Sequence, residues 1–285
     1  MEEGGRTQPL WLRMVAHLGL VVFSAIFCVP FLWLVSRSLM TNDQIMQEPH
    51  SLMDLIPAPV RLANYPDALA FKGFHFTTYL TNTLIICALT VFGTILSCSL
   101  VAYGLSRIYW RGRNVVFYIL LGTMMLPAQV TMIPVFVVFA KLRLVDTFVP
   151  LILPAFLGNA FFVFLLRQFF LGIPRDLTDA ARLDGCTEFG IWRQVVIPLS
   201  KPALATVGLF SFMGAWNDYL GPLIYLSDSS KFTLSLGLAS FSSQYGQEPG
   251  MLMAATTVMT VPIIVLFFFA QRTFIQGITL TGLKG

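Results

Sequence analysis

Residues 76–106 read FTTYLTNTLIICALTVFGTILSCSLVAYGLS, a run that contains no Asp, Glu, Lys or Arg. An α-helix rises about 1.5 Å per residue, so about 20 such residues cross the roughly 30 Å hydrocarbon core of a membrane. The run exceeds this length, and its polar and apolar residues do not alternate with a period of two. It therefore predicts a membrane-spanning helix and argues against a strand of a β-barrel.

Similar stretches recur along the chain, which has 285 residues, of which 56% are hydrophobic and only 11% are charged. Soluble domains carry about 25% charged residues. The apolar stretches predict six spans, at about 14–36, 76–106, 114–140, 147–170, 203–226 and 251–271. The first is longer than the apolar core of a signal peptide, so we expect it to be retained. The expected fold is an all-α integral membrane protein with a single transmembrane domain, residues 1–285.

The basic residues are distributed unequally between the two sides that six spans would create. Twelve of the 18 Lys and Arg residues lie on the side that holds both termini, and six lie on the other side. The positive-inside rule predicts that the richer side, with both termini, is cytoplasmic. This asymmetry also accounts for the net charge of +4 without a nucleic-acid partner. The four cysteines show no CxxC or Cys/His ligand spacing, so we predict neither a disulfide nor a metal site.

The loop between the fourth and fifth spans, within residues 173–202, has the pattern of two short helices. From Ile173 to Pro198 it reads IPRDLTDAARLDGCTEFGIWRQVVIP. Pro174 followed by acidic residues predicts a helix start. Gly185 predicts its end, with the positive φ that glycine tolerates, and Thr187 predicts the cap of a second helix.

Two interpretations of this loop are open from the pattern alone. It is either an amphipathic connector that lies on the membrane surface or a docking element for a protein partner. In the second case the small side chains of Ala180 and Ala181 permit close approach, and nearby charges pair with the partner. Gly185 serves as a helix cap in both cases.

The spacing of the loop resembles the EAA motif of ABC importer permeases, Glu-Ala-Ala-x3-Gly-x9-Ile-x-Leu-Pro. The matching run is Asp179-Ala180-Ala181, then Gly185, then Val195-x-Ile197-Pro198. Asp179 replaces the usual Glu, which keeps the charge and shortens the side chain. The resemblance implies that the loop couples the chain to an ATPase, through Asp179, Ala180, Ala181, Arg182, Asp184, Gly185, Ile197 and Pro198.

Other segments resemble the permeases of the carbohydrate branch, which carry maltose-type sugars and glycerol 3-phosphate. These segments are Asn64-Tyr65, Asn82-Thr83, Ala102–Arg107, Trp216–Tyr219 and the ending Gly282-Leu283-Lys284-Gly285. The match runs from about residue 60 to the end and is closest to the shorter, six-helix subunit of the permease pair. A permease for a non-sugar solute such as a polyamine, phosphate or a glycerophosphodiester is the alternative.

The resemblance implies the fold of a type I ABC importer permease in a bacterial inner membrane. Its implied partners are membrane lipid, a second permease subunit that completes a heterodimer, two ATPase subunits and an extracytoplasmic solute-binding protein. No P-loop pattern GxxxxGK[ST] occurs in this chain. We therefore expect it not to be an enzyme and to bind no cofactor itself, with ATP and Mg held by the ATPase subunits.

Asp218 is the one acidic residue within the predicted spans. An ionisable side chain is costly in a membrane and usually faces a cavity or a partner. Either Trp216, Asn217, Asp218 and Tyr219 line the translocation pathway or its outer gate, or they form a structural hydrogen-bond network. The following polar segment, residues 227–250, resembles the loop that contacts the binding protein, although a solvated linker has the same composition.

Overall fold

The computed structural model describes residues 9–47, 52–71, 74–244 and 248–282, and all regular elements in these ranges are helices. The described residues form two compact units. Unit 1 combines the residues up to Phe74 with Phe241–Thr260, and unit 2 combines His75–Ser240 with the residues from Val261 onward. By length and composition, four helices could each cross a membrane, or up to six if each of two bent helix pairs counts as one span.

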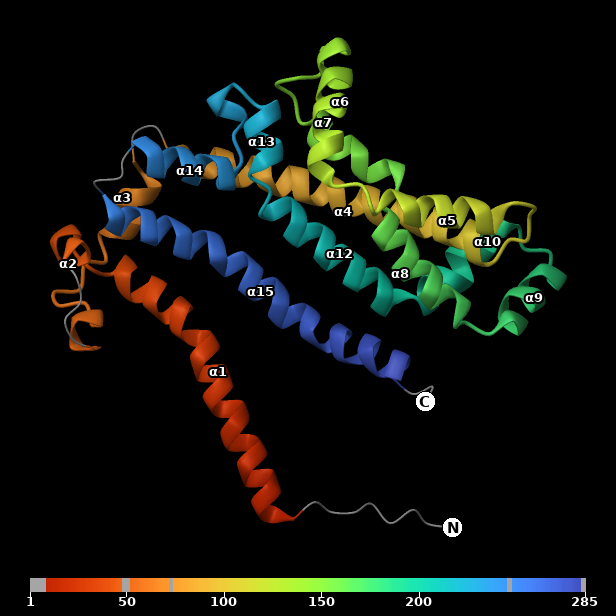
Figure 1. The fold of residues 1–285 in the computed structure, drawn as a ribbon, viewed down its shortest axis with the longest axis horizontal. Helices are drawn as coiled ribbons and strands as arrows, with labels where there is room; N and C mark the ends of the chain where they lie inside the picture. The colour runs from red at the N-terminus through yellow and green to blue at the C-terminus, as the bar shows by residue number, and fades with distance from the viewer. Residues whose placement is uncertain (1–8, 48–51, 72–73, 245–247, 283–285) are drawn as a thin grey trace. The chain divides into compact units, whose positions relative to one another are not determined.

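Unit 1 contains a long apolar helix and several short ones (Figure 1). They are α1 (Leu10–Ser38), α2 (Asn42–Met46), a 3-10 helix η1 (Leu52–Leu55), α3 (Asn64–Leu69) and the first part of α15 (Pro249–Gly282). None of the residues in the most apolar part of α1 is buried against the described residues of unit 1. A helix that is apolar all round needs lipid or another protein to cover it.

Asn64 and Tyr65, singled out in the sequence, fix the chain reversal after α1. The buried Asn64 amide donates hydrogen bonds to the carbonyls of Ser38 (2.9 Å) and Met40 (2.7 Å). The Tyr65 hydroxyl lies 2.8 Å from the Ser38 hydroxyl. Because carbonyls at a helix C-terminus have no intrahelical partner, these contacts stabilise the end of α1.

Unit 2 is built around α4 (Phe76–Ser106), which packs along α8 (Ala160–Leu171) and α12 (Lys201–Trp216) (Figure 1). Cys98, Val163 and Val207 are completely buried where these three helices meet. Small residues on α4 permit close packing, as expected for helices in a membrane. At Gly93, an added Cβ would lie only 2.5 Å from the ring of Phe156.

Unit 2 also contains the part of α15 from Val261 onward, and shorter helices complete it. They are α5 (Arg113–Thr123), α6 (Ala128–Lys141), α7 (Val149–Ile152), η2 (Leu153–Leu157), α9 (Arg175–Leu183), α10 (Glu188–Ile191), the π-helical turn η3 (Trp192–Val196), α11 (Ile197–Leu199), α13 (Leu220–Tyr225), η4 (Ser229–Lys231) and α14 (Leu234–Gln244, the last residues of which belong to unit 1).

Three of the stretches predicted as spans are interrupted in the structure. In the stretch 147–170, the non-helical residues Gly158 and Asn159 separate η2 from α8. Residues 114–140 form α5 and α6, whose axes differ by 98°. Pro127 precedes α6 and has no N–H to continue a helix, which favours a break there. In the stretch 203–226, α12 ends at Trp216, and the Asp218 carboxylate accepts a hydrogen bond from the Gly221 N–H (3.0 Å) at the start of α13. Asp218 therefore lies at a break between helices and not within one.

Candidate functional site

The loop 173–202 folds as the predicted pair of short helices. Helix α9 begins directly after Pro174, and Gly185 has a φ of +82°, as expected for a glycine that ends a helix. The Thr187 hydroxyl accepts a hydrogen bond from the Gly190 N–H (3.2 Å) and caps α10. These features confirm the helix–glycine–helix prediction. The loop then continues through η3 and α11 and bends by 83° into α12.

Helix α9 presents most of its predicted docking residues on the surface. Asp179, Ala180, Asp184 and Gly185 are exposed, and the Leu183 side chain beside them is 90% exposed. The opposite face packs inward, with Thr178 2% exposed and Ala181 against the core of unit 2. The face of α9 that carries the predicted docking residues is therefore accessible in the described part of unit 2.

The remaining two residues of the predicted set lie at the far end of the loop. Ile197 packs partly against the core of unit 2, and Pro198 is exposed in the last turn before α12. They are therefore separated from the exposed face of α9 and occupy the segment that leads into α12.

Arg182 is the centre of a charged network that joins the two short helices to α4. Its guanidinium contacts Asp179 (2.7 Å) and Glu188 (2.8 Å). The Tyr103 hydroxyl, on α4, donates to the other oxygen of the Glu188 carboxylate (2.5 Å). The hydrogen bonds from Arg182 lower the pKa of the Glu188 carboxyl, although burial opposes this shift. Sequence reasoning missed Glu188 and Tyr103, because an acid in a first helical turn and a tyrosine in a span have ordinary local explanations.

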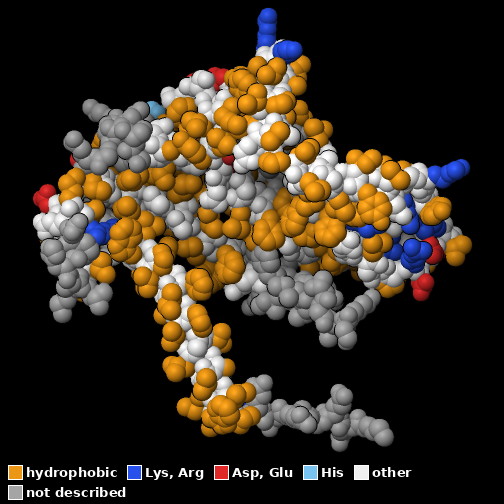
Figure 2. Space-filling view, in the orientation of Figure 1, with side chains coloured by type: hydrophobic (Ala, Val, Ile, Leu, Met, Phe, Trp, Pro, Cys, Tyr) orange, Lys and Arg blue, Asp and Glu red, His pale blue; other side chains and the backbone are white. Residues whose placement is uncertain are grey.

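Two further arginines brace the ends of α4 and α8. Arg107 follows α4 and donates to the carbonyls of Phe170 and Ile173, and Arg167 on α8 donates to the carbonyl of Leu105 (3.2 Å). Each guanidinium therefore satisfies carbonyls at the C-terminal end of the other helix, where positive charge is favourable. Charged side chains gather at this end of unit 2, whereas the visible sides of its helices are mainly hydrophobic (Figure 2).

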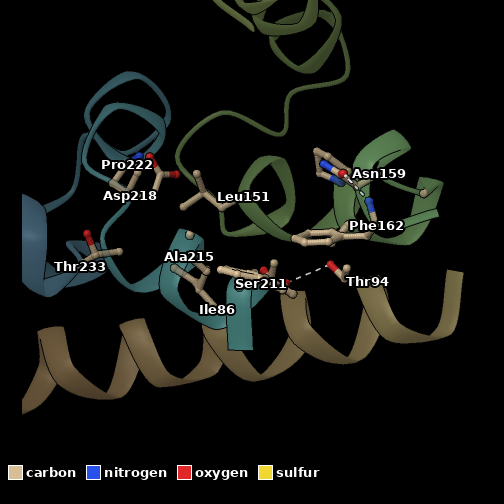
Figure 3. A pocket seen from close by; sticks show the side chains of 16 residues that line it. Ile86, Thr94, Leu151, Asn159, Phe162, Ser211, Ala215, Asp218, Pro222 and Thr233 are labelled. Atoms are coloured by element: carbon tan, nitrogen blue, oxygen red, sulfur yellow. Dashed lines mark hydrogen bonds between the residues drawn. The ribbon is translucent and has the colours of Figure 1, made fainter. Parts of the chain in front are cut away.

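A cavity of about 470 Å³ lies in unit 2 (Figure 3). Its volume is in the range of small-molecule sites. Among the residues that the structure describes, Asp218 is the one charged side chain that lines it. The other polar lining side chains are Thr90, Thr94, Asn159, Ser211 and Thr233, and most of the rest are apolar or aromatic.

The polar groups of this cavity are only partly satisfied by one another. The Ser211 hydroxyl donates to the Thr94 hydroxyl (3.1 Å), whereas the buried Thr90 hydroxyl oxygen has no partner within the described chain. Asp218 lies near Leu151 and Pro222 at one end, and Asn159 lies at the other (Figure 3). A bound molecule with hydroxyl groups could hydrogen-bond to side chains at both ends.

The other three residues of the Trp216–Tyr219 group do not line this cavity. Trp216 is completely buried and stacks on Phe212, with ring centroids 5.4 Å apart. The Asn217 amide donates to the Met213 carbonyl (2.9 Å), which places it at the end of α12, and Tyr219 is exposed. The group therefore combines one cavity residue with residues that end and anchor a helix.

Asn82 and Thr83 tie the segment after α13 to α4. The Asn82 amide donates to the carbonyls of Ser230 (2.9 Å) and Phe232 (3.0 Å), and the Thr83 hydroxyl accepts from the Leu234 N–H (2.9 Å). The beginning of the predicted outer loop is thus anchored. Residues 245–247 of that loop, and Leu283, Lys284 and Gly285 of the C-terminal motif, lie outside the described residues.

Apolar helices, an exposed charged helical loop and a cavity with a few polar side chains are features expected of an integral membrane transport component. Within residues 9–47, 52–71, 74–244 and 248–282, no group of three or more His, Cys, Asp or Glu side chains could hold a metal ion. The family model described as "binding-protein-dependent transport system inner membrane component" matches residues 96–280, and the chain belongs to this family. The predicted relationship to ABC importer permeases and the inner-membrane location are thereby confirmed.

Relatives are similar over nearly the whole chain. The arabinooligosaccharides transport system permease protein AraQ of Bacillus subtilis (strain 168) is 35% identical, over 96% of both chains. The trehalose/maltose transport system permease protein MalG of Thermococcus litoralis is 30% identical, over 96% of this chain and 97% of its own. A chain of a bacterial ABC transporter involved in the import of the acidic polysaccharide alginate superimposes with a TM-score of 0.78 at 26% identity, covering 95% of this chain and 99% of that one.

Proposed function

We propose that this chain is the permease subunit of an ATP-driven importer for sugars or sugar-like solutes and forms half of the translocation pathway. The observation that carries the proposal is the similarity, over 96% of the chain, to permeases named for arabinooligosaccharides and for trehalose and maltose. The other half of the pathway belongs to a second permease subunit. This arrangement also supplies a surface to cover the apolar face of α1, alongside lipid.

In the membrane the chain crosses six times as one transmembrane domain, with both termini in the cytoplasm. The four long apolar helices, the bent pair α5–α6 and the apolar helix α12 support this number. Twelve of the 18 Lys and Arg residues lie on the side with the termini, which supports the orientation. The loop 173–202 is then cytoplasmic.

The cytoplasmic loop docks on an ATPase subunit. Its exposed face on α9, with Leu183 between charged residues, supports this role. ATP and Mg bind to two separate ATPase subunits, because the chain has no P-loop. The chain itself is not an enzyme and instead transmits the conformational change that ATP drives.

The cavity beside Asp218 contacts the solute during translocation. A carboxylate, several hydroxyls and an amide within a largely apolar lining are suited to a molecule with many hydroxyl groups and apolar CH faces. Trp216, Asn217 and Tyr219 hold the helix break that presents Asp218. An extracytoplasmic binding protein delivers the solute at the outer segment, 227–250, the beginning of which Asn82 and Thr83 anchor.

Uptake measurements with a panel of solutes test this function. The complete complex is reconstituted in vesicles, and ATP-dependent uptake of labelled arabinooligosaccharides, maltose, spermidine and phosphate is compared. We expect uptake of at least one saccharide and neither of the other two solutes. Uptake of spermidine or phosphate alone would contradict the assignment to sugars.

A further inference from the structure

The helix α9 is held to unit 2 by few apolar contacts. Its inward face contributes the small side chains of Thr178 and Ala181, whereas Leu177 and Leu183 point outward and are exposed. Small side chains bury little apolar surface and therefore contribute little to the free energy of packing. Polar contacts must therefore do much to hold the loop to the rest of unit 2 when a bound partner protein moves it.

The Glu188 carboxylate makes the polar contact that joins the loop to α4. One of its oxygens lies 2.8 Å from the Arg182 Nε, and the other accepts from the Tyr103 hydroxyl at 2.5 Å and lies 3.3 Å from a second Arg182 nitrogen. One carboxylate thus connects α9, α10 and α4. Hydrogen bonds to a charged group are stronger than those between neutral groups.

The end of α4 that receives this contact is itself fixed to α8. Tyr103 is buried near the end of α4, and the next turn carries Arg107, which donates to the carbonyls of Phe170 and Ile173. A displacement applied at Glu188 is therefore passed to α4 and, through Arg107, to α8. By contrast, the covalent route from α10 runs through η3 and α11 into α12.

We infer that Glu188 and Tyr103 are positioning residues that transmit the displacement of the loop to α4. The inference rests on the proposed docking of the loop on an ATPase subunit. The Glu188–Tyr103 contact transmits the displacement to α4, while the backbone from α10 transmits it to α12. The two helices therefore move together around the cavity that both of them line. Without this contact, the ATPase subunits would still hydrolyse ATP. Their closure would then move α12 without a matching movement of α4.

The test measures solute imported per ATP hydrolysed by the complete complex in vesicles. Tyr103→Phe removes the hydroxyl and keeps the ring, and we expect the ratio to fall by about tenfold, the lower end of the effect of a lost hydrogen bond to a charged group. Glu188→Ala is expected to lower it at least as much. In the Glu188→Ala background, Tyr103→Phe should have no further effect, because both changes remove the same contact.

Two matched controls separate this role from general damage. Tyr118→Phe removes a hydroxyl from an exposed tyrosine of α5, and Asp67→Asn breaks the exposed ion pair with Arg61 (3.5 Å); neither should change the ratio. An unchanged ratio in Tyr103→Phe, or additive losses in the double variant, would overturn the inference. If the complex with Glu188→Ala fails to assemble, the ratio of solute imported to ATP hydrolysed in Tyr103→Phe alone tests the inference. A failure of the proposed function can be distinguished from a failure of this inference, because the unmodified complex itself would then show no ATP-driven uptake.

Discussion

Gly185 occupies a backbone conformation that residues with a Cβ rarely adopt, with a φ of +82°. For such residues a left-handed conformation costs about 1–2 kcal/mol. We expect Gly185→Val to leave the complex assembled but to distort the joint between α9 and α10, so that the exposed face of α9 docks less well. The solute imported per ATP hydrolysed should fall severalfold in vesicles.

The matched control is Gly185→Asn, because asparagine tolerates this conformation better than valine. An added Cβ at this position meets no other atom within 4 Å, so crowding inside the chain does not complicate the comparison. The asparagine variant should import nearly as much solute per ATP hydrolysed as the unmodified complex. A valine variant with the unmodified ratio would remove the docking role assigned to this joint.

Asp218 can be tested without disturbing the helix break that it stabilises. Asp218→Asn retains an oxygen to accept the hydrogen bond from the Gly221 N–H but removes the charge that faces the cavity. We expect normal assembly and a saccharide uptake rate reduced about tenfold, the effect of losing a hydrogen bond to a charged group. Unchanged uptake would leave Asp218 with a structural role alone.

Asp146 gives a prediction for low pH. Lys231 (2.6 Å) and the N–H groups of Ser227 and Asp228 donate to its carboxylate and lower its pKa to about 2. A carboxyl whose pKa is lowered on folding stabilises the fold above its unfolded pKa of about 4, and this stabilisation is lost as the pH falls toward 2. The unmodified chain should therefore be more thermally stable than Asp146→Asn at pH 6.

The same comparison at lower pH supplies the control. The difference in unfolding temperature between the two proteins in detergent should shrink progressively from about pH 4 to about pH 2. Asparagine tolerates the positive φ of 61° found at Asp146, so a change in backbone strain does not contribute to the difference in unfolding temperature. A difference that is constant across this pH range would show that the carboxylate charge is not responsible.

At the scale of elements, α4 organises unit 2 because other segments are hydrogen-bonded to its polar side chains. Asn82→Ala removes the two hydrogen bonds to the Ser230 and Phe232 carbonyls, at a cost of about 1–3 kcal/mol. We expect the segment around η4 to loosen from α4 and to exchange its amide hydrogens about ten times faster. Hydrogen exchange measured by mass spectrometry on the complete complex checks this.

Thr81→Ala is the control for Asn82→Ala, because among the described residues the Thr81 hydroxyl bonds within its own helix, to the Thr77 carbonyl. It should leave exchange in the η4 segment unchanged. If amide hydrogens of that segment exchange as slowly in Asn82→Ala as in the unmodified protein, the anchoring role is contradicted.

The elements that could be predicted from sequence are those with local signals. Pro174, Gly185 and Thr187 each act on neighbouring backbone, and the pair of short helices follows from them. The Glu188–Tyr103 contact joins residues 85 positions apart and leaves no local pattern. Likewise, Pro127 favours a break between α5 and α6, but composition alone does not give its angle of 98°.

At the scale of the whole molecule, composition and charge were enough to predict a membrane protein, and the spacing of the loop was enough to predict its family. The cavity was not predictable in the same way, because its lining comes from six helical elements and most of its residues are ordinary in a span. Asp218 alone gave a signal, since a charge in an apolar stretch requires an explanation.

The most direct test of the central claim is purification of the tagged chain from its native membrane, followed by an ATPase assay. We predict that a second permease subunit and an ATPase subunit co-purify with it. ATP hydrolysis should then rise when the saccharide-loaded binding protein is added and should respond much less to the unloaded protein. A purified complex that contains no ATPase, or whose hydrolysis is indifferent to the loaded binding protein, would contradict the account.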